Sequence, residues 1–173
     1  YLGVAYLDEA IQLRKNDIRL PIMIMNVDWN HFGLLESFQL EPEIYSMAML
    51  KSYVASTTNP SPIHIKIETG MNRLGFEVSQ LDELCQFLKS NADIKVAGIF
   101  THFSSADDPN HDAFTDQQAS IFEQAYQKIS EHIGYKPIKH AVNSVGMVGF
   151  PQYHFDMVRL GIGLYGYDSS HSD

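Results

Sequence analysis

An arginine lies within an apolar run, Met157 to Tyr167, near the end of the sequence. A buried arginine is costly unless it is paired or hydrogen-bonded, so Arg159 in this position suggests a specific partner. Gly161 and Gly163 follow it closely, and glycine allows the backbone to approach a phosphate. We therefore predict that Arg159 is a functional group beside an anion site. The alternative is a glycine-rich strand used for packing alone.

A second stretch of interest runs from Lys66 to Gly75, where Lys66 and Arg73 flank a glycine-bearing turn. The guanidinium of Arg73 offers a rigid fork of donors that suits a carboxylate or a phenolate. The alternative is a turn that carries a solvated arginine. Both this stretch and the run around Arg159 lie at or near predicted strand ends, where barrel enzymes place their sites.

Histidines mark two further candidate positions. His140 and Ser144 are predicted to share one face of a strand, and His102 follows the end of another strand, where it could contact a ligand. A lone histidine is more often structural. Two histidines and three aspartates could also suggest a metal site: His102, His111, Asp107, Asp108 and Asp112. We predict no metal there, because the residues lie in a loop and form no helical histidine pair.

Strands and helices alternate along the chain. The predicted strands are Leu2–Ala5, Pro21–Met25, Glu43–Ser46, Ile63–Glu68, Ile94–Thr101, Ile138–Ser144 and Met157–Tyr165. The predicted helices begin at Asp8, run over His31–Phe38 and Met47–Ala55, and start at capping boxes at Ser79 and Thr115, the last ending at Gly134. Serial strand–helix units build either a doubly wound sheet or a closed barrel.

The strand Ile63–Glu68 decides between these two folds. Its isoleucines point one way, and His64, Lys66 and Glu68 point the other. A flat sheet covered by helices on both faces would hardly tolerate such a polar row, whereas a barrel interior that holds a polar ligand would. We predict an α/β fold, a (β/α)8 TIM-type barrel that is truncated, with its first strand and last helix missing.

Composition narrows the class of protein. The 173 residues carry a formal net charge of −9, which argues against a nucleic-acid partner. Cys85 is the only cysteine, which excludes an internal disulfide framework and suits a reducing compartment. No apolar run approaches the roughly 18 residues of a membrane-spanning helix, and no signal peptide is recognisable. We predict a cytoplasmic protein without a membrane partner.

Taken together, the motifs resemble those of the alanine racemases, which use pyridoxal 5′-phosphate (PLP). The matching stretches are Lys66–Gly75, Gly98–Asp107, His140–Ser144 and Met157–Gly166, and the resemblance covers nearly the whole chain. The order and spacing are similar to those of the family's N-terminal barrel. The stretch Asn26–Glu43 also resembles the racemase half of bacterial chains that are fused to a cell-wall peptide ligase.

The resemblance implies a role for each matching residue. Around the cofactor ring, Arg159 would donate to the pyridine nitrogen, His140 would hold Arg159, and His102 would lie against the ring. The phosphate would be bound by Ser144 and the backbone of Gly161 and Ile162, with Asn143 beside it. Arg73 would reach the phenolic oxygen and the substrate carboxylate. Lys66 would be the lysine that family members often carry as a carbamate, whose negative charge positions Arg73. Glu68 and Asn72 depart from the family's commonest Asp and Gly.

The resemblance also implies that the two catalytic bases lie outside this chain. The family's Schiff-base lysine precedes Tyr1, and its opposite-face tyrosine belongs to a C-terminal β domain that follows Asp173. Residues 1–173 are therefore expected to be a partial N-terminal PLP-binding barrel domain with no catalytic residue of its own. The parent protein would interconvert L-alanine and D-alanine for peptidoglycan synthesis, as a homodimer, and the fragment alone would be inactive. The alternatives are a decarboxylase or a non-catalytic PLP carrier of the same barrel fold, a domain-docking module, or an isolated phosphate-binding barrel.

Overall fold

Six parallel strands form one sheet in the computed structural model, which describes residues 1–167. The sheet order follows the sequence, β1-β2-β3-β4-β5-β6. The strands are β1 (Leu2–Val4), β2 (Ile22–Ile24), β3 (Glu41–Ile44), β4 (Ile63–Lys66), β5 (Val96–Phe100) and β6 (Ile138–His140). A sheet in which every strand pairs with its sequence neighbours is the arrangement of a (β/α) barrel. The predicted fold class, a truncated α/β TIM-type barrel, is confirmed at this level.

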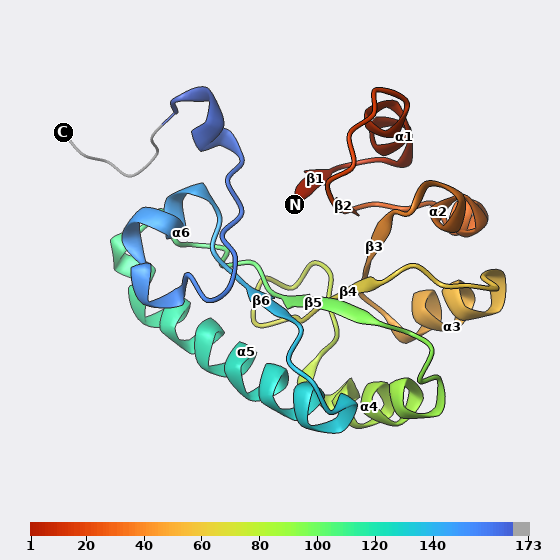
Figure 1. Cartoon of the computed structure of the whole chain (residues 1–173). Coiled ribbons are helices and arrows are strands. Elements are labelled where there is room, and N and C mark those ends of the chain that lie inside the picture. Colours follow the sequence, from red (N-terminus) through yellow and green to blue (C-terminus); the bar gives the residue numbers. More distant parts are fainter. Residues whose placement is uncertain (168–173) are drawn as a thin grey trace.

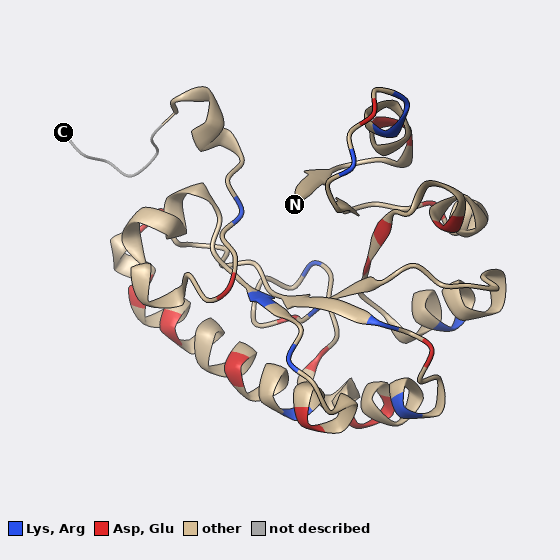
Figure 2. Cartoon of the chain, in the orientation of Figure 1, with Lys and Arg blue, Asp and Glu red and all other residues tan. Residues whose placement is uncertain are grey.

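Helices follow the strands and lie along the outer side of the curved sheet (Figure 1). They are α1 (Leu7–Lys15), α2 (Phe32–Phe38), α3 (Met47–Ser56), α4 (Leu81–Ser90), α5 (Asp112–Ile133) and α6 (Ser144–Gly149). Gly134 ends α5 with a φ of 79°, as its position in the sequence predicts. Figure 2 shows acidic and basic residues along these outer helices. No helix within residues 1–167 is both long and apolar enough to cross a membrane.

The alternation predicted for β4 is present. Ile63, Ile65 and Ile67 belong to the apolar core that also contains Leu84 of α4 and Phe122 of α5. The polar residues of β4 are buried as well, but they face acidic residues of β3. His64 Nε2 lies 2.8 Å from a carboxylate oxygen of Glu41, and Lys66 Nζ lies 3.0 Å from one of Glu43. At β3 and β4 the inner face of the sheet therefore carries two hydrogen-bonded polar pairs.

The predicted strand Met157–Tyr165 is wrong. Only Met157 bridges to His140, and residues Ile162–Tyr165 form a 3₁₀ helix. The backbone amides of Gly161 and Gly163 donate to the hydroxyl of Ser144 instead of to a neighbouring strand, so the ladder ends there. The predicted strand Ile138–Ser144 is too long: it ends at His140, and Asn143 caps α6, which begins at Ser144, so His140 and Ser144 do not share a strand face as predicted.

The two predicted capping boxes are also misplaced. A 3₁₀ turn at Val78–Gln80 precedes α4, and the chain enters that turn at Glu77 rather than at Ser79. Helix α5 begins at Asp112, three residues before Thr115, and Thr115 is buried inside the helix. Another turn, Pro109–His111, leads into α5, with the Asp108 carboxylate capping it. In both places a 3₁₀ turn extends the helix beyond the motif.

Candidate functional site

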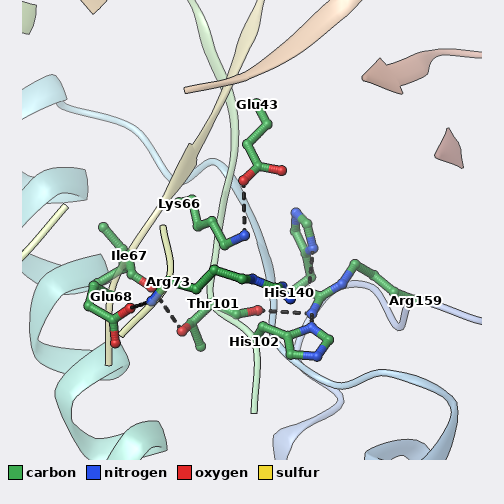
Figure 3. A network of polar contacts seen from close by, with 9 residues as sticks. All are labelled: Glu43, Lys66, Ile67, Glu68, Arg73, Thr101, His102, His140 and Arg159. Atoms are coloured by element: carbon green, nitrogen blue, oxygen red, sulfur yellow. Dashed lines mark hydrogen bonds and ion pairs between the residues drawn. The ribbon is translucent and has the colours of Figure 1, made fainter. Parts of the chain in front are cut away.

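Charged and polar side chains converge at the carboxyl ends of the strands. They come from the segments that follow β4, β5 and β6 and from the segment around Arg159 (Figure 3). This is the end of a barrel at which loops from different strands meet, so residues far apart in the sequence become neighbours. The sequence analysis put these segments at or near strand ends, although the segment around Arg159 is not itself a strand.

Arg159 is held by hydrogen bonds to three different residues. Its Nη1 lies 3.0 Å from Nδ1 of His140, and its Nη2 donates to the carbonyl oxygens of Thr101 (2.9 Å) and Ala141 (2.7 Å). These bonds use the two terminal nitrogens, and among the described residues Nε–H has no acceptor. Burial lowers the pKa of Arg159 to about 10, against the opposite effect of Glu43. The side chain is therefore a fixed cation whose Nε–H remains free to donate.

His140 is completely buried and stacks on Phe100, with ring centroids 4.8 Å apart. Because Arg159 can only donate, Nδ1 of His140 must accept, and the ring proton of the neutral imidazole sits on Nε2. Burial and the charge of Arg159 lower the pKa of His140 well below 6.5. His140 thus stays neutral and orients Arg159 through this hydrogen bond.

His102 lies on the other side of Arg159, with Nδ1 3.4 Å from Nη2. Its backbone carbonyl accepts a hydrogen bond from Gln118, which also donates to Thr69. The hydroxyl of Thr69 bonds that of Thr101 at 2.8 Å. Sequence reasoning missed Gln118, Thr69 and Thr101, because uncharged polar residues in a helix and at strand ends carry no distinctive signal.

The titration of His102 gives a testable prediction. Burial, and then the charges of Arg159, Arg73 and Lys66, lower the pKa of His102 to about 4. In the unfolded chain it is about 6.5, so between these values only the unfolded state binds the proton. The stability that comes with the neutral imidazole is complete above about pH 6.5 and is lost as the pH falls toward 4, by up to about 1.4 kcal/mol per pH unit.

The check is chemical denaturation of the wild type and of His102→Asn between pH 4 and pH 7. We expect the free energy of unfolding to fall more steeply with decreasing pH in the wild type, because the variant lacks this titration. Equal slopes in the two proteins would contradict the lowered pKa.

Backbone amides converge beside Arg159. The amides of Gly161 and Gly163 donate to the same oxygen, Oγ of Ser144, at 2.9 and 3.2 Å. Two amides aimed at one oxygen can equally well bind an oxygen of an anion. Asn143 caps α6 through its side-chain oxygen, which accepts from the amide of Gly146 at 2.9 Å. Of the phosphate-binding candidates, Ile162 has an exposed side chain and forms the first residue of the 3₁₀ helix.

The loop after β4 is shaped by Glu68. Its carboxylate accepts hydrogen bonds from the amides of Gly70 and Arg73. Burial raises the pKa of Glu68, but backbone amides of this loop lower it more, so that the pKa lies below its usual value. Asn72 has a φ of 54°, a conformation that asparagine tolerates better than most residues. Glu68 and Asn72 stand where the resembled family most often has Asp and Gly, and both are therefore compatible with the structure of this loop.

Arg73 is exposed, and its side chain extends from this loop toward Lys66, His102 and Arg159 (Figure 3). Its charge lowers the pKa of both Glu43 and His102, which places it within electrostatic reach of both. The alternative prediction, a turn that carries a solvated arginine, is thus partly right. The Arg73 side chain is exposed to solvent, but it lies on the inner side of the sheet.

Two acidic residues of β3 complete the site, and sequence reasoning missed both. Glu41 and Glu43 pair with His64 and Lys66 of β4. Their spacing of two residues, which puts them on one face of a strand, was the available signal. Among the described residues, no group of three or more His, Cys, Asp or Glu side chains is arranged to hold a metal ion.

A cavity of about 260 Å³ opens beside Arg159. It is lined by residues from β1, from β2 and its C-terminal end, and from the last segment, including Tyr1, Met23, Met157, Arg159 and Gly161. A larger cavity of about 650 Å³ lies around the end of α5, at the amino-terminal end of β6. The smaller cavity is the better candidate for a ligand site, because it alone of the two borders Arg159 and the Gly161 amide.

Comparisons with known proteins agree with this arrangement. The sequence model of the family described as "Alanine racemase, N-terminal domain" matches residues 1–169. "Alanine racemase 1" of Oceanobacillus iheyensis is 38% identical over 174 residues, covering 96% of this chain and 45% of the relative. "Alanine racemase" of Nostoc sp. is 34% identical, covering 95% of this chain and 44% of the relative. The chain thus spans a little under half the length of these relatives.

Solved structures show the same likeness. Alanine racemase from Corynebacterium glutamicum superposes with a TM-score of 0.90 at 27% identity, covering 99% of this chain and 49% of that one. Alanine racemase from E. faecalis gives a TM-score of 0.85 at 32% identity, covering 97% and 46%. The fold is shared with these proteins over nearly the whole chain.

Proposed function

Because the chain belongs to the alanine racemase N-terminal domain family, we propose that the protein containing it interconverts L-alanine and D-alanine, and that residues 1–173 form its PLP-binding barrel domain. The observation that carries the proposal is Arg159, which is fixed by His140, Thr101 and Ala141 beside two convergent backbone amides. A cationic donor next to an anion-binding pair of amides matches the two polar ends of PLP.

The residues present fit this cofactor. Nε–H of Arg159 is free among the described residues and could donate to the pyridine nitrogen. Ser144 and the amides of Gly161 and Gly163 would hold the phosphate, with Ile162 and Asn143 beside it. A Cβ at Gly163 would lie 3.0 Å from Cδ1 of Leu160 and 3.3 Å from Cβ and Oγ of Ser144, so a larger residue there would have to displace these side chains. His102 would lie against the ring.

Bound PLP supplies an electron sink for the pair of electrons left when the α-proton of the amino acid is removed. Because Arg159 can only donate a hydrogen bond, it would leave the pyridine nitrogen without a proton and keep that sink weak. A weak sink would limit side reactions such as transamination. His140 holds Arg159 in place for this role by accepting from its Nη1. Arg73 would neutralise the phenolic oxygen and the carboxylate of the substrate.

Proton removal and return on opposite faces of the α-carbon need two bases. We propose that neither is among these 173 residues, and that a lysine and a tyrosine come from other parts of the full-length protein, the tyrosine from the partner in a homodimer. The short span relative to the racemases, 45% of the length of one of them, supports this view. Residues 1–173 alone would then be inactive. We also propose a cytoplasmic role in supplying D-alanine for peptidoglycan.

The test is to incubate the full-length protein with L-alanine, with and without PLP, and to measure D-alanine by chiral chromatography. We expect PLP-dependent conversion in both directions, and PLP absorbance that shifts on binding. Ser144→Ala is expected to weaken PLP binding about tenfold, the effect of losing one hydrogen bond to a charged group. PLP binding without conversion by the full-length protein would favour a carrier, and self-association without PLP binding would favour a docking module.

A further inference from the structure

Lys66 and Glu43 form a buried ion pair at the centre of the inner face. Nζ of Lys66 lies 3.0 Å from Oε1 of Glu43, and the two side chains are only 5% and 1% exposed (Figure 3). Neighbouring positions in the β3–β4 register bring them together, since Glu43 is paired with His64 and Ile44 with Ile65. The pair is thus fixed by two paired strands rather than by flexible loops.

This pair bears on the chemical state of Lys66. A lysine becomes a carbamate when its neutral amine attacks CO2: a nitrogen–carbon bond forms, one proton leaves, and the group becomes negatively charged. The reaction therefore needs an amine that has lost its ammonium proton. A carboxylate at 3.0 Å stabilises the ammonium form instead, because opposite charges in a buried site favour the ionised state of both groups.

The product would also be unfavourable in this position. A carbamate on Lys66 would place a second negative group beside the buried carboxylate of Glu43, and like charges at short range repel strongly where water is excluded. The ammonium already has further favourable contacts, because Nζ lies 5.6 Å from the centroid of the Phe100 ring. Glu43 therefore disfavours carbamylation of Lys66 in two ways: it stabilises the unreactive ammonium form, and it would repel the carbamate.

We propose that Lys66 remains an unmodified ammonium ion and that Glu43 supplies the buried negative charge of this site. Glu43 then acts as a positioning residue. Burial raises the pKa of Glu43 above its ordinary value, and the charges of Lys66, Arg159 and Arg73 offset part of that rise, so the carboxylate relies on these cations to stay ionised. One carboxylate, present in the sequence itself, takes the place of a charge that would otherwise have to be added to Lys66. The proposal rests on the proposed function in one respect only, namely that Glu43, Lys66, Arg73 and Arg159 belong to a ligand-binding site.

The experiment uses the full-length protein equilibrated with ¹³C-labelled bicarbonate and observes the carbamate carbon by ¹³C NMR. We expect no carbamate signal from Lys66 in the wild type. In Glu43→Gln the carboxylate is gone, and we expect a carbamate signal that disappears in the double variant with Lys66→Arg. Glu43→Asp keeps the charge and should remain without the signal.

A matched control is available on the surface. Lys51 and Glu83 form an ion pair of similar length, 2.8 Å, but their side chains are 54% and 57% exposed. Glu83→Gln should therefore leave the spectrum as in the wild type. A Lys66 carbamate in the wild type would overturn the proposal, and so would its absence from a folded Glu43→Gln protein. If the Gln variant fails to fold, the wild-type spectrum alone still decides the state of Lys66.

The outcome is distinguishable from a failure of the proposed function. The NMR signal reports the chemical state of Lys66 whether or not alanine is the substrate. Conversely, a wild-type protein that does not racemise alanine would refute the proposed activity without changing the spectrum.

Discussion

Replacing Arg159 by methionine in the full-length protein is expected to lower the free energy of unfolding by about 3 kcal/mol and to weaken PLP binding by roughly 10- to 100-fold. The substitution leaves Nδ1 of His140 and the carbonyl oxygens of Thr101 and Ala141 without their donor. Each buried acceptor without a donor costs about 1–3 kcal/mol. PLP in turn would lose a charge-assisted hydrogen bond to its ring nitrogen.

The measurements are chemical denaturation without PLP and titration of PLP by absorbance. Arg159→Lys is the matched variant, since it keeps the charge but cannot reach three acceptors from one nitrogen, and it should fall between the wild type and the methionine variant. Wild-type stability in Arg159→Met would show that the three bonds are not important for the fold. Wild-type PLP affinity would remove Arg159 from the proposed site.

Replacing Gly98 by alanine is expected to have an effect of similar size on stability. A Cβ at this position in β5 would lie 2.4 Å from Nδ1 and 2.9 Å from Cε1 of His64, and 3.3 Å from Nε2 of His140. His64 is completely buried and is held by Glu41 at 2.8 Å, so it has no free space into which to move. Overpacking of this kind costs about 1–3 kcal/mol, and we expect the upper end.

Gly3 provides the control for this substitution. It lies in β1, and a Cβ built there would meet no heavy atom within 4 Å. Gly3→Ala should change the free energy of unfolding by no more than about 0.5 kcal/mol, as is usual away from the core. The two variants are compared by their denaturation midpoints. Similar midpoints for both would mean that the two histidine rings are not packed against Gly98 as the structure shows.

The repeated strand–helix pattern and the polar face of β4 were sufficient to predict the barrel. Alternating side chains point to opposite faces of any strand, so Ile63, Ile65 and Ile67 had to be buried on one side and His64 and Lys66 had to meet polar partners on the other. The inward arginine was also predictable, because a single charge within an apolar run must find partners. The resemblance to alanine racemases, read from the same motifs, is confirmed by the family match.

The error over residues 157–165 shows where such reasoning stops. An apolar run with glycines is compatible with a strand or with a loop that binds an anion, and local pattern does not separate them. Here the hydroxyl of Ser144 receives the amides of Gly161 and Gly163, and the strand ends. The two hydrogen bonds join residues that are 17 and 19 positions apart in the sequence, so a local sequence pattern does not contain them.

The amino-acid sequence alone shows which residue types are available to the site and, for β4, on which face of the strand His64 and Lys66 lie. The partners of these side chains depend on how the chain folds. The carbonyl groups that bind Arg159 belong to Thr101 and Ala141, and every residue has a carbonyl, so no residue type marks these two as acceptors. Likewise, Lys66 meets Glu43 because β3 and β4 pair in one register, and register is a property of two strands together rather than of either alone.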